Sequence, residues 1–387
     1  MTAPRKKPRA TQGLDASNDV VVVGAGLIGL AIAFELAERG ASVTVYDSRE
    51  PGRAASWAAA GMLAPYTERI TNEALLALCT RSLAEYETFV RRIFDASGID
   101  AHLRLNGVLY AAFGGGELDA LREHRSALQA RGIDCEMLNR ASALSAEPWL
   151  GATLVGGLLK KGEGCVDNRR LARALVAACQ ARGARIEHSS SIDVECDAGR
   201  VLGIRTDGGR VRARAVVNAC GAWAAELAGI PQSCVPPIEP VKGQMIALAV
   251  PPGFAKHVTW VPKAYLVPIE EGRLLVGATV ELAGFDERVT AEGVHGLLHA
   301  ALAAAPSLAD FSITESWAGL RPGTPDGLPF LGPTPIEGLF LATGHYRNGI
   351  LLVPETARLI ADAIGSGATA PLEPFSIARL SAKKTVS

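Results

Sequence analysis

The chain has 387 residues, of which 48% are hydrophobic and 20% are charged, and its formal net charge is −1. This length gives room for two domains, or for one large two-lobed domain, with a sizeable core. The near-neutral charge offers no electrostatic attraction to nucleic acid or to an anionic membrane, so we expect neither as a partner.

The N-terminal segment and the cysteines indicate a cytoplasmic protein. Residues 1–14 are basic and polar, lack the apolar core and cleavage site of a signal peptide, and are predicted to form a disordered tail. The apolar stretch from Val20 to Phe34 has 15 residues, whereas a membrane-spanning helix needs about 20. The seven cysteines include no C-x-x-C pair, which argues against a zinc ribbon or a disulfide framework and favours free thiols.

A nucleotide-binding turn is predicted after this tail. The valines at 20–23 indicate a buried strand of a parallel sheet, and Gly24, Gly26 and Gly29 follow in G-x-G-x-x-G spacing before a helix predicted over 30–39. The N-terminus of that helix would supply N–H donors and a positive dipole to a pyrophosphate. Asp47, after a second predicted strand, is placed to accept hydrogen bonds from a ribose. The pattern predicts a dinucleotide site without distinguishing FAD from a nicotinamide.

The segment EPGRAASWAAAGMLAP (50–65) does not suit the regular βα alternation of NAD-type dehydrogenases, and its small residues suit close contact with a large flat cofactor. Two later segments, 212–229 and 337–364, each read as a strand, a glycine-containing turn and a helix, and are predicted to return the chain to the first sheet. If the helix beginning near Ile350 points at a flavin, its N-terminus would stabilise the negative charge of the reduced ring. A plain packing helix is the alternative.

Four motifs resemble the glycine oxidases of thiamine biosynthesis, within the D-amino acid oxidase and sarcosine oxidase group of flavoproteins. The similarity covers about residues 19–375, and the motifs are AASWAAAGMLAP (54–65), YLVPIEEGRLLVGAT (265–279), WAGLRPGTPDGLPFLGP (317–333) and ATGHYRNGILLVP (342–354). The resemblance implies an FAD-dependent enzyme that oxidises glycine to an imine and glyoxylate, with hydride transfer to flavin N5 and reoxidation by O2 to H2O2. A sarcosine or D-amino acid oxidase, or a dehydrogenase of the same fold, is the alternative within this group.

Two other classes of function stay open. One is a flavin-binding subunit whose activity needs a partner chain, and the other is a nicotinamide-dependent enzyme. A homo-oligomer, and a thiazole synthase as the recipient of the imine, stay open as partners.

The cofactor contacts are expected to come from well-separated pieces of the sequence. The expected FAD-binding residues are Gly24, Gly26, Leu27, Ile28, Gly29, Asp47, Ser48, Ala55, Ser56, Ala60, Gly61, Met62, Gly344, His345, Tyr346, Arg347, Asn348, Gly349, Ile350 and Leu351. Relatives with covalent flavin use a cysteine where this chain has Gly319, so non-covalent FAD is expected.

The resemblance implies that three side chains bind substrate. Arg321, a permanent cation among glycines, prolines and apolar residues, is expected to hold the substrate carboxylate with its two-pronged guanidinium, the alternative being a structural ion pair. Tyr265 is expected to bind the same carboxylate, or else to pack as an aromatic residue. Arg347 is expected near flavin and substrate, or else beside a structural carboxylate.

No catalytic base and no metal are expected, because the flavin performs the hydride transfer from a neutral amine. His345 is therefore assigned a backbone contact to FAD. His295 and His299 stand four apart on a predicted helix without an evident third ligand. The family tends to have a histidine and a methionine where this chain has Lys263 and Val280, which leaves the exact substrate preference open.

The predicted fold class is α/β, with a Rossmann-like FAD-binding domain and a smaller α+β substrate domain whose sheet is mainly antiparallel. The expected division is an FAD-binding domain at 15–90, 161–232 and 330–380, a substrate domain at 91–160 and 233–329, and tails at 1–14 and 381–387.

Overall fold

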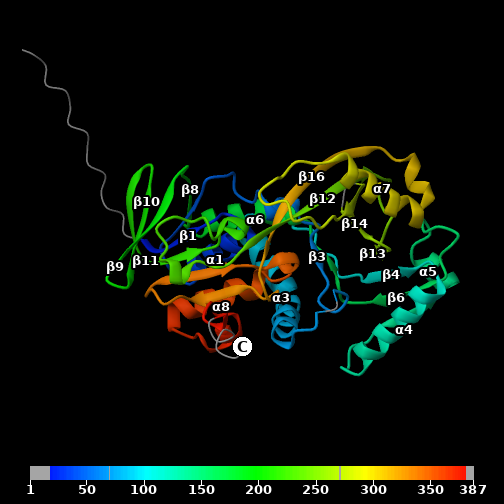
Figure 1. The fold of residues 1–387 in the computed structure, drawn as a ribbon, viewed down its shortest axis with the longest axis horizontal. Coiled ribbons are helices and arrows are strands. Elements are labelled where there is room, and N and C mark those ends of the chain that lie inside the picture. Colours follow the sequence, from blue (N-terminus) through cyan, green and yellow to red (C-terminus); the bar gives the residue numbers. More distant parts are fainter. Residues whose placement is uncertain (1–17, 69, 270–271, 381–387) are drawn as a thin grey trace, which may run out of the picture.

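The computed structural model describes residues 18–68, 70–269 and 272–380. The predicted tails at 1–14 and 381–387 lie outside these residues. Two large sheets lie side by side along the long axis of the molecule (Figure 1). The prediction of a mixed α/β fold with a nucleotide-binding sheet and a mainly antiparallel sheet is confirmed.

The first sheet is built around the valine-rich strand at the start of the described chain. β1 pairs in parallel with β2 on one side and with β11 on the other, as expected for a buried strand of a nucleotide-binding fold. The strands, in spatial order, are β17 (Phe330–Pro333), β18 (Leu339–Thr343), β11 (Gly209–Asn218), β1 (Asn18–Val23), β2 (Val43–Asp47) and β8 (Arg185–His188).

Helices cover one face of this sheet and a β-meander covers the other. The helices are α1 (Leu27–Glu38), α3 (Glu73–Ser97), α6 (Asn168–Ala181) and α8 (Val353–Ser366), and they pack against one another. The long strand β11 continues into an antiparallel meander with β9 (Ile192–Asp197) and β10 (Arg200–Thr206). Val21 and Val23 of β1 pack beneath this meander, whereas Val20 and Val22 pack against the helices.

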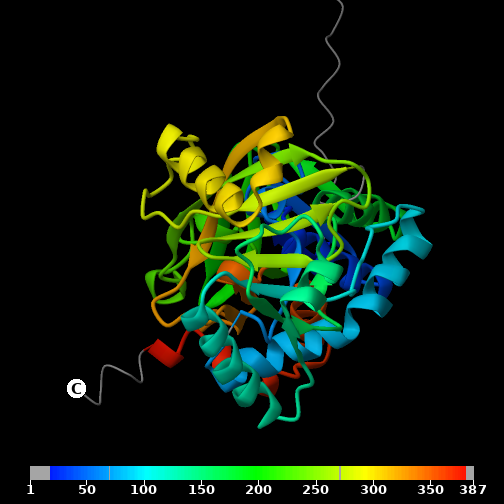
Figure 2. The ribbon, with the colours of Figure 1, turned by 90° about the vertical axis from the view of Figure 1, so that its right-hand side faces the viewer.

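The second sheet is antiparallel except where β13 meets β4. Its strands, in spatial order, are β16 (Ile313–Gly323), β12 (Glu239–Ala249), β15 (Arg273–Gly277), β14 (Ala264–Ile269), β13 (Val258–Val261), β4 (Val108–Ala112), β6 (Gly156–Lys160) and β5 (Glu136–Asn139). Helix α7 (Ala291–Ala304) packs across one face of this sheet, as Figure 2 shows. α4 (Gly115–Gln129) and α5 (Arg140–Ala146) pack beside β5 and β6.

The remaining elements are short. They are α2 (Ala55–Ala58), the two-stranded ladder of β3 (Met62–Leu63) and β7 (Gly164–Cys165), and the 3-10 turns η1 (Gly221–Trp223), η2 (Gln232–Cys234), η3 (Pro306–Asp310), η4 (Tyr346–Asn348) and η5 (Ala370–Phe375). The division into two domains at the expected boundaries stays a prediction. No helix of the described residues is long and apolar enough to cross a bilayer.

Two helix starts differ from expectation. α1 begins at Leu27 rather than Leu30, because Gly26 takes the extended N-cap conformation with φ −71° and ψ 175°. α8 begins at Val353 rather than near Ile350, because the 3-10 turn η4 and a further turn occupy residues 346–352.

Candidate active site

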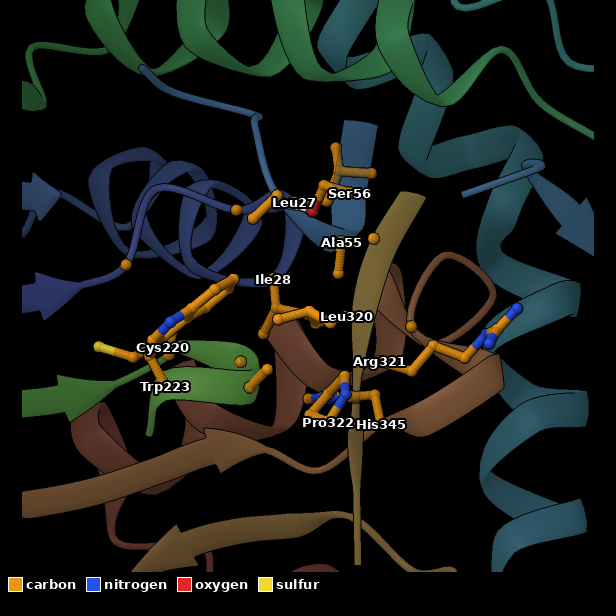
Figure 3. A pocket seen from close by; sticks show the side chains of 18 of the residues that line it. Leu27, Ile28, Ala55, Ser56, Cys220, Trp223, Leu320, Arg321, Pro322 and His345 are labelled. Carbon is orange, nitrogen blue, oxygen red and sulfur yellow. Dashed lines mark hydrogen bonds between the residues drawn. The ribbon is translucent and has the colours of Figure 1, made fainter. Parts of the chain in front are cut away.

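A cavity of about 560 Å³ lies between the two sheets. Its wall combines the β1–α1 turn and the end of β2 with α2, η1, the residues around η4, and strands β12, β14 and β16. Figure 3 shows it extending from Cys220 and Trp223 on one side to Arg321 on the other, with Leu27 and Ser56 between them. The segments that form it are far apart in sequence, so the fold assembles the site.

The glycine turn at the start of α1 leaves no room for side chains. Gly24 has φ +109°, and a Cβ there would lie 2.4 Å from the carbonyl oxygen of Ala219. A Cβ on Gly29 would lie 1.9 Å from the carbonyl oxygen of Gly24, so Gly29 permits the close packing of helix on strand. Gly26, at the N-cap, has no side chain to bond the first N–H groups of α1. The N–H of Leu27 donates to Ser56, and the N-terminus of this twelve-residue helix faces the cavity with its positive dipole end, as a pyrophosphate site requires.

Asp47 closes the other side of this turn. Its Oδ2 accepts the N–H of Ala25 at 2.6 Å, and its Oδ1 accepts the N–H of Arg49 at 2.8 Å. The guanidinium of Arg49 lies 4.0 Å from the ring centre of Trp223, and both residues line the cavity. The carboxylate of Asp47, which backbone N–H groups hold at the end of β2, suits the hydroxyl groups of a ribose. The neighbouring cation–π pair of Arg49 and Trp223 suits the flat adenine ring of an adenosine.

Most of the expected cofactor residues line the cavity. Those that do are Gly24, Gly26, Leu27, Ile28, Asp47, Ser48, Ala55, Ser56, Ala60, Gly61, Met62, His345, Tyr346, Arg347, Gly349 and Ile350. The side-chain oxygen of Ser56 accepts the N–H of Leu27 at 2.9 Å, which joins α2 to the glycine turn.

The other four expected cofactor residues are not part of the cavity wall. Gly29 packs on Gly24, and a Cβ on Gly344 would meet the Thr324 side chain at 2.6 Å, so both are needed for close approach of chain segments. Leu351 is 2% exposed in the helix-side core. The N–H of Asn348 bonds the carbonyl oxygen of His345. A direct contact of these four with the cofactor stays a prediction.

Arg321 reaches into the cavity from β16 and lies across β12. A Cβ on Gly243 would lie 2.3 Å from Nη2 and 2.4 Å from Nη1 of Arg321, so the guanidinium occupies the space left by this glycine. Nη1 donates to the carbonyl oxygens of Lys242 at 3.3 Å and Thr279 at 3.2 Å. Within residues 18–68, 70–269 and 272–380, no carboxylate forms an ion pair with this guanidinium. The positive charge of Arg321 is therefore stabilised by uncharged hydrogen-bond acceptors, the two backbone carbonyl oxygens.

Tyr265 lies on β14, also in the wall. It is 7% exposed, and its ring packs edge-on against Trp260 with ring centroids 5.2 Å apart. A Cβ on the paired residue Gly277 would lie 2.6 Å from the tyrosine ring, so a glycine there makes room for it. Burial raises the pKa of Tyr265, and the nearby Arg321 and Arg347 oppose that rise, so its hydroxyl is protonated at neutral pH and able to donate.

Arg347 forms an ion pair with Glu68, a wall residue that our sequence interpretation missed. Nε of Arg347 lies 3.1 Å from Oε2 of Glu68, and a third of the Arg347 side chain, 33%, is exposed. Burial raises the pKa of the Glu68 carboxyl, while Arg347 and, more weakly, Arg321 oppose that shift. Since Arg347 has a carboxylate partner within the chain, its expected role in substrate binding stays a prediction.

His345 is unsuited to be a base. It is 5% exposed, its Nε2 lies 3.2 Å from the hydroxyl oxygen of Thr356, and burial lowers its pKa to about 3. The imidazole is therefore neutral and a very weak proton acceptor at physiological pH.

The family departures lie outside the cavity wall. Lys263 is exposed in the turn between β13 and β14 with φ +67°, and Val280 is 55% exposed. The rings of His295 and His299 on α7 stack with centroids 6.1 Å apart, and the described residues contain no group of three or more metal-ligating side chains.

Our sequence interpretation did not identify several other residues of the cavity wall, because no local sequence motif marks them. They include Arg49, Glu68, Ser190, Ser191, Cys220, Trp223, Gly243 and Met245. Only Cys220 and Trp223 had a signal, because they flank the predicted turn at Gly221.

Three comparisons with known proteins bear on this site. The family described as FAD dependent oxidoreductase matches residues 19–363. A glycine oxidase of Geobacillus kaustophilus is 40% identical over 367 residues, which cover 93% of this chain and 97% of that protein. A crystal structure of glycine oxidase from Geobacillus kaustophilus superposes on this chain with a TM-score of 0.87. The two are 38% identical, and the match covers 94% of this chain and 99% of that one.

A bifunctional protein ThiO/ThiG of Nostoc sp. is also 40% identical, over 361 residues covering 92% of this chain. The chain spans about half the length of such bifunctional relatives, 54% in this case.

Proposed function

Since the chain belongs to the FAD dependent oxidoreductase family, we propose that it oxidises glycine to the imine, which leaves or hydrolyses to glyoxylate and ammonia. The relatives at about 40% identity support this substrate, because one is named glycine oxidase and covers nearly the whole of both chains. The family match confirms the prediction of FAD as cofactor, and the degree of identity confirms the resemblance to glycine oxidases.

The observation that carries the proposal is a guanidinium in the cavity wall that forms no ion pair with a carboxylate of the described residues. Within the described residues, Arg321 donates through Nη1 to two backbone carbonyl oxygens, and its positive charge is not neutralised by an ion pair. A partly buried arginine of this kind attracts a ligand carboxylate, which it can hold with two parallel hydrogen bonds. Tyr265, whose hydroxyl stays protonated, supplies a further donor from strand β14 of the same sheet.

The residues of the glycine turn and Asp47 would hold FAD, as the fit of the turn to a pyrophosphate indicates. Bound FAD would accept a hydride from the substrate α-carbon and pass the electrons to O2, which yields H2O2. The chain itself binds and orients the substrate. Arg321 and Tyr265 fix the carboxylate, and this fixes where the α-carbon lies in the cavity.

Proton transfer by a side chain is not needed for this reaction if the amine enters neutral. His345, with its pKa lowered to about 3 by burial, is a poor acceptor for an ammonium proton. Glu68 is the one carboxylate of the described cavity wall near Arg321, and its ion pair with Arg347 leaves it without an uncompensated charge. We propose that the amine loses its proton to solvent before oxidation.

The alternative is a sarcosine or D-amino acid oxidase or dehydrogenase, and the names of the relatives do not favour it. Measuring peroxide and glyoxylate release with glycine, sarcosine and D-alanine distinguishes these functions. Glycine should give the highest kcat/KM. A higher value for sarcosine or D-alanine would overturn the proposed substrate, and flavin reduction without peroxide would indicate a dehydrogenase.

We further propose that a thiazole synthase receives the imine. The fused ThiO/ThiG relatives support this pairing, since about half of each corresponds to the present chain. Homo-oligomerisation and a cytoplasmic location stay predictions. Sedimentation of the purified protein, alone and with a thiazole synthase, tests the two kinds of assembly.

A further inference from the structure

A cluster of polar side chains lies on β12, the strand over which the Arg321 guanidinium lies, and on the segment that follows β15. Lys242 and Gln244 on β12 are 1% and 0% exposed. Nζ of Lys242 lies 3.3 Å from Oε2 of Glu281, and Nε2 of Gln244 donates to Oε1 of Glu281 at 2.8 Å. The hydroxyl of Thr279 donates to the same Oε1. The carboxylate of Glu281 is thus the common acceptor of three side chains.

The cluster fastens residues 279–281 to β12. Lys242 and Glu281 exchange both backbone N–H···O bonds at 2.9 Å, and the N–H of Gln244 donates to the hydroxyl oxygen of Thr279 at 2.8 Å. Gln244 also bonds Thr290, the N-cap of α7, through both ends of its amide. The segment that follows β15 is therefore held along the edge of β12 as an extension of the sheet.

The cluster and Arg321 occupy opposite faces of β12. Side chains alternate along a strand, and Arg321 fills the space over Gly243, which lies between Lys242 and Gln244. The two carbonyls that accept Nη1 of Arg321 belong to Lys242 and Thr279. Both acceptors of the guanidinium thus come from residues whose side chains bond Glu281 on the far face.

We propose that Glu281 is a positioning residue for the substrate-binding arginine, acting through the backbone of Lys242 and Thr279. It holds their carbonyl oxygens where they restrain Nη1, so that the remaining N–H groups of Arg321 are presented to a ligand carboxylate. This inference rests on the proposed function only for the identity of the ligand, since it concerns the binding of any small carboxylate.

The physical reason is the charge of Lys242. An ammonium with its side chain 2% exposed is costly to bury unless it is paired. Hydrogen bonds from Thr279, Gln244 and Lys242 outweigh burial and lower the pKa of Glu281, so the carboxylate is ionised at neutral pH. Without it, Lys242 must move toward water, and its backbone, which supports Arg321, moves with it.

The test compares Glu281→Ala with the wild-type holoenzyme and with Glu292→Ala, an exposed acid in the first turn of α7. The readouts are KM and kcat for glycine, the Kd of acetate from the change in flavin absorbance, and the FAD content. We expect Glu281→Ala to raise KM and the acetate Kd by about tenfold. We expect kcat at saturating glycine, FAD content and the Glu292→Ala values to stay near wild type.

A background variant separates positioning from general damage. In Arg321→Lys, the carbonyl restraint on a planar guanidinium is already lost, so adding Glu281→Ala should not raise the acetate Kd further. The same rise in both backgrounds, or a wild-type Kd in Glu281→Ala, would overturn the inference. If Glu281→Ala does not fold, Glu281→Gln keeps one acceptor oxygen and should raise the Kd by a smaller factor, whereas an unchanged Kd overturns the inference.

The two proposals fail differently. Acetate binding without glycine turnover overturns the proposed substrate alone, and the comparison of variants still decides the role of Glu281. Absence of acetate binding in the wild type overturns the role of Arg321 and the inference about Glu281 with it.

Discussion

The guanidinium of Arg347 and the carboxylate of Glu68 form an ion pair at the wall of the cavity, with Nε and Oε2 3.1 Å apart. Arg321 lines the same cavity with backbone carbonyls as its partners. Of these two arginines, only Arg347 forms an ion pair with a carboxylate within the described residues. This difference supports our proposal that Arg321, rather than Arg347, binds the substrate carboxylate.

Replacing Arg321 with leucine should abolish carboxylate binding while FAD is retained. Loss of a charged two-pronged donor should raise KM for glycine and the acetate Kd by about 100-fold or more. The FAD content should not change, because the glycine turn and Asp47 are formed by other elements. Arg214→Leu, at an exposed arginine on β11, is the control. A normal acetate Kd in Arg321→Leu would refute this assignment.

A methyl group at Gly243 should displace the Arg321 guanidinium, since its Cβ would lie within 2.5 Å of three guanidinium atoms. We expect Gly243→Ala to raise KM for glycine by about 10- to 100-fold, because small displacements of a binding group are costly. Steady-state kinetics at equal FAD content measure this. Gly296→Ala, where an added Cβ has no neighbour within 4 Å, should behave as wild type. Equal KM values for both variants would show that the guanidinium is not held over Gly243.

Glu68 should make carboxylate binding depend on pH. Burial raises the pKa of this carboxyl, so it takes up a proton at a pH above the usual range of a glutamate. Protonation removes a negative charge from the cavity, and the acetate Kd should therefore decrease as the pH falls from above the raised pKa of Glu68 to below it. Glu68→Gln should bind acetate more tightly at the upper pH and lose this dependence. The exposed Glu87→Gln on α3 is the control. An unchanged pH profile in Glu68→Gln would contradict the prediction.

His345 should affect stability in acid rather than catalysis near neutral pH. Its pKa is about 3 in the folded protein, against an ordinary value of 6.5, so between these values the unfolded chain binds more protons. The free energy of unfolding should therefore fall as the pH drops below 6.5, by about 2 kcal/mol at about pH 5 from this group alone. Denaturant unfolding at about pH 8 and pH 5 should show this loss in wild type.

The matched variants for that measurement are His345→Gln and His188→Gln, the second at an exposed position on β8. His345→Gln should remove most of the acid-induced loss, and His188→Gln should keep it. If both variants lose the same stability on acidification, the buried imidazole is not the cause.

The sequence predicted the parts of this protein that have a local signature. The glycine spacing at 24–29, the valine strand and Asp47 are one continuous βαβ pattern, and the structure brings Gly24, Gly26 and Asp47 to the cavity wall. Arg321 drew attention as a permanent cation in an apolar, glycine-rich segment, its role was predicted from the resemblance of its motif to a known family, and the fold places it at the cavity.

The remaining wall residues had no such signature. Glu68 follows α2 in an irregular segment, and only the tertiary fold brings it to Arg347, which is 279 positions later in the chain. Gly243 on β12 makes room for the Arg321 guanidinium, and Glu281 pairs with Lys242 of the same strand. These contacts depend on the pairing of strands that are far apart in the sequence, which local periodicity does not reveal. Gly344 and Leu351 lie in a recognisable motif, but the motif does not reveal that their contacts are with Thr324 and the core.

Anaerobic addition of glycine to the purified holoenzyme tests the central claim most directly. If the chain oxidises glycine held by Arg321, the visible absorbance of its oxidised flavin should bleach as glycine is added, and Arg321→Leu should stay yellow at the same concentrations. A wild-type protein that stays yellow at high glycine would contradict the account.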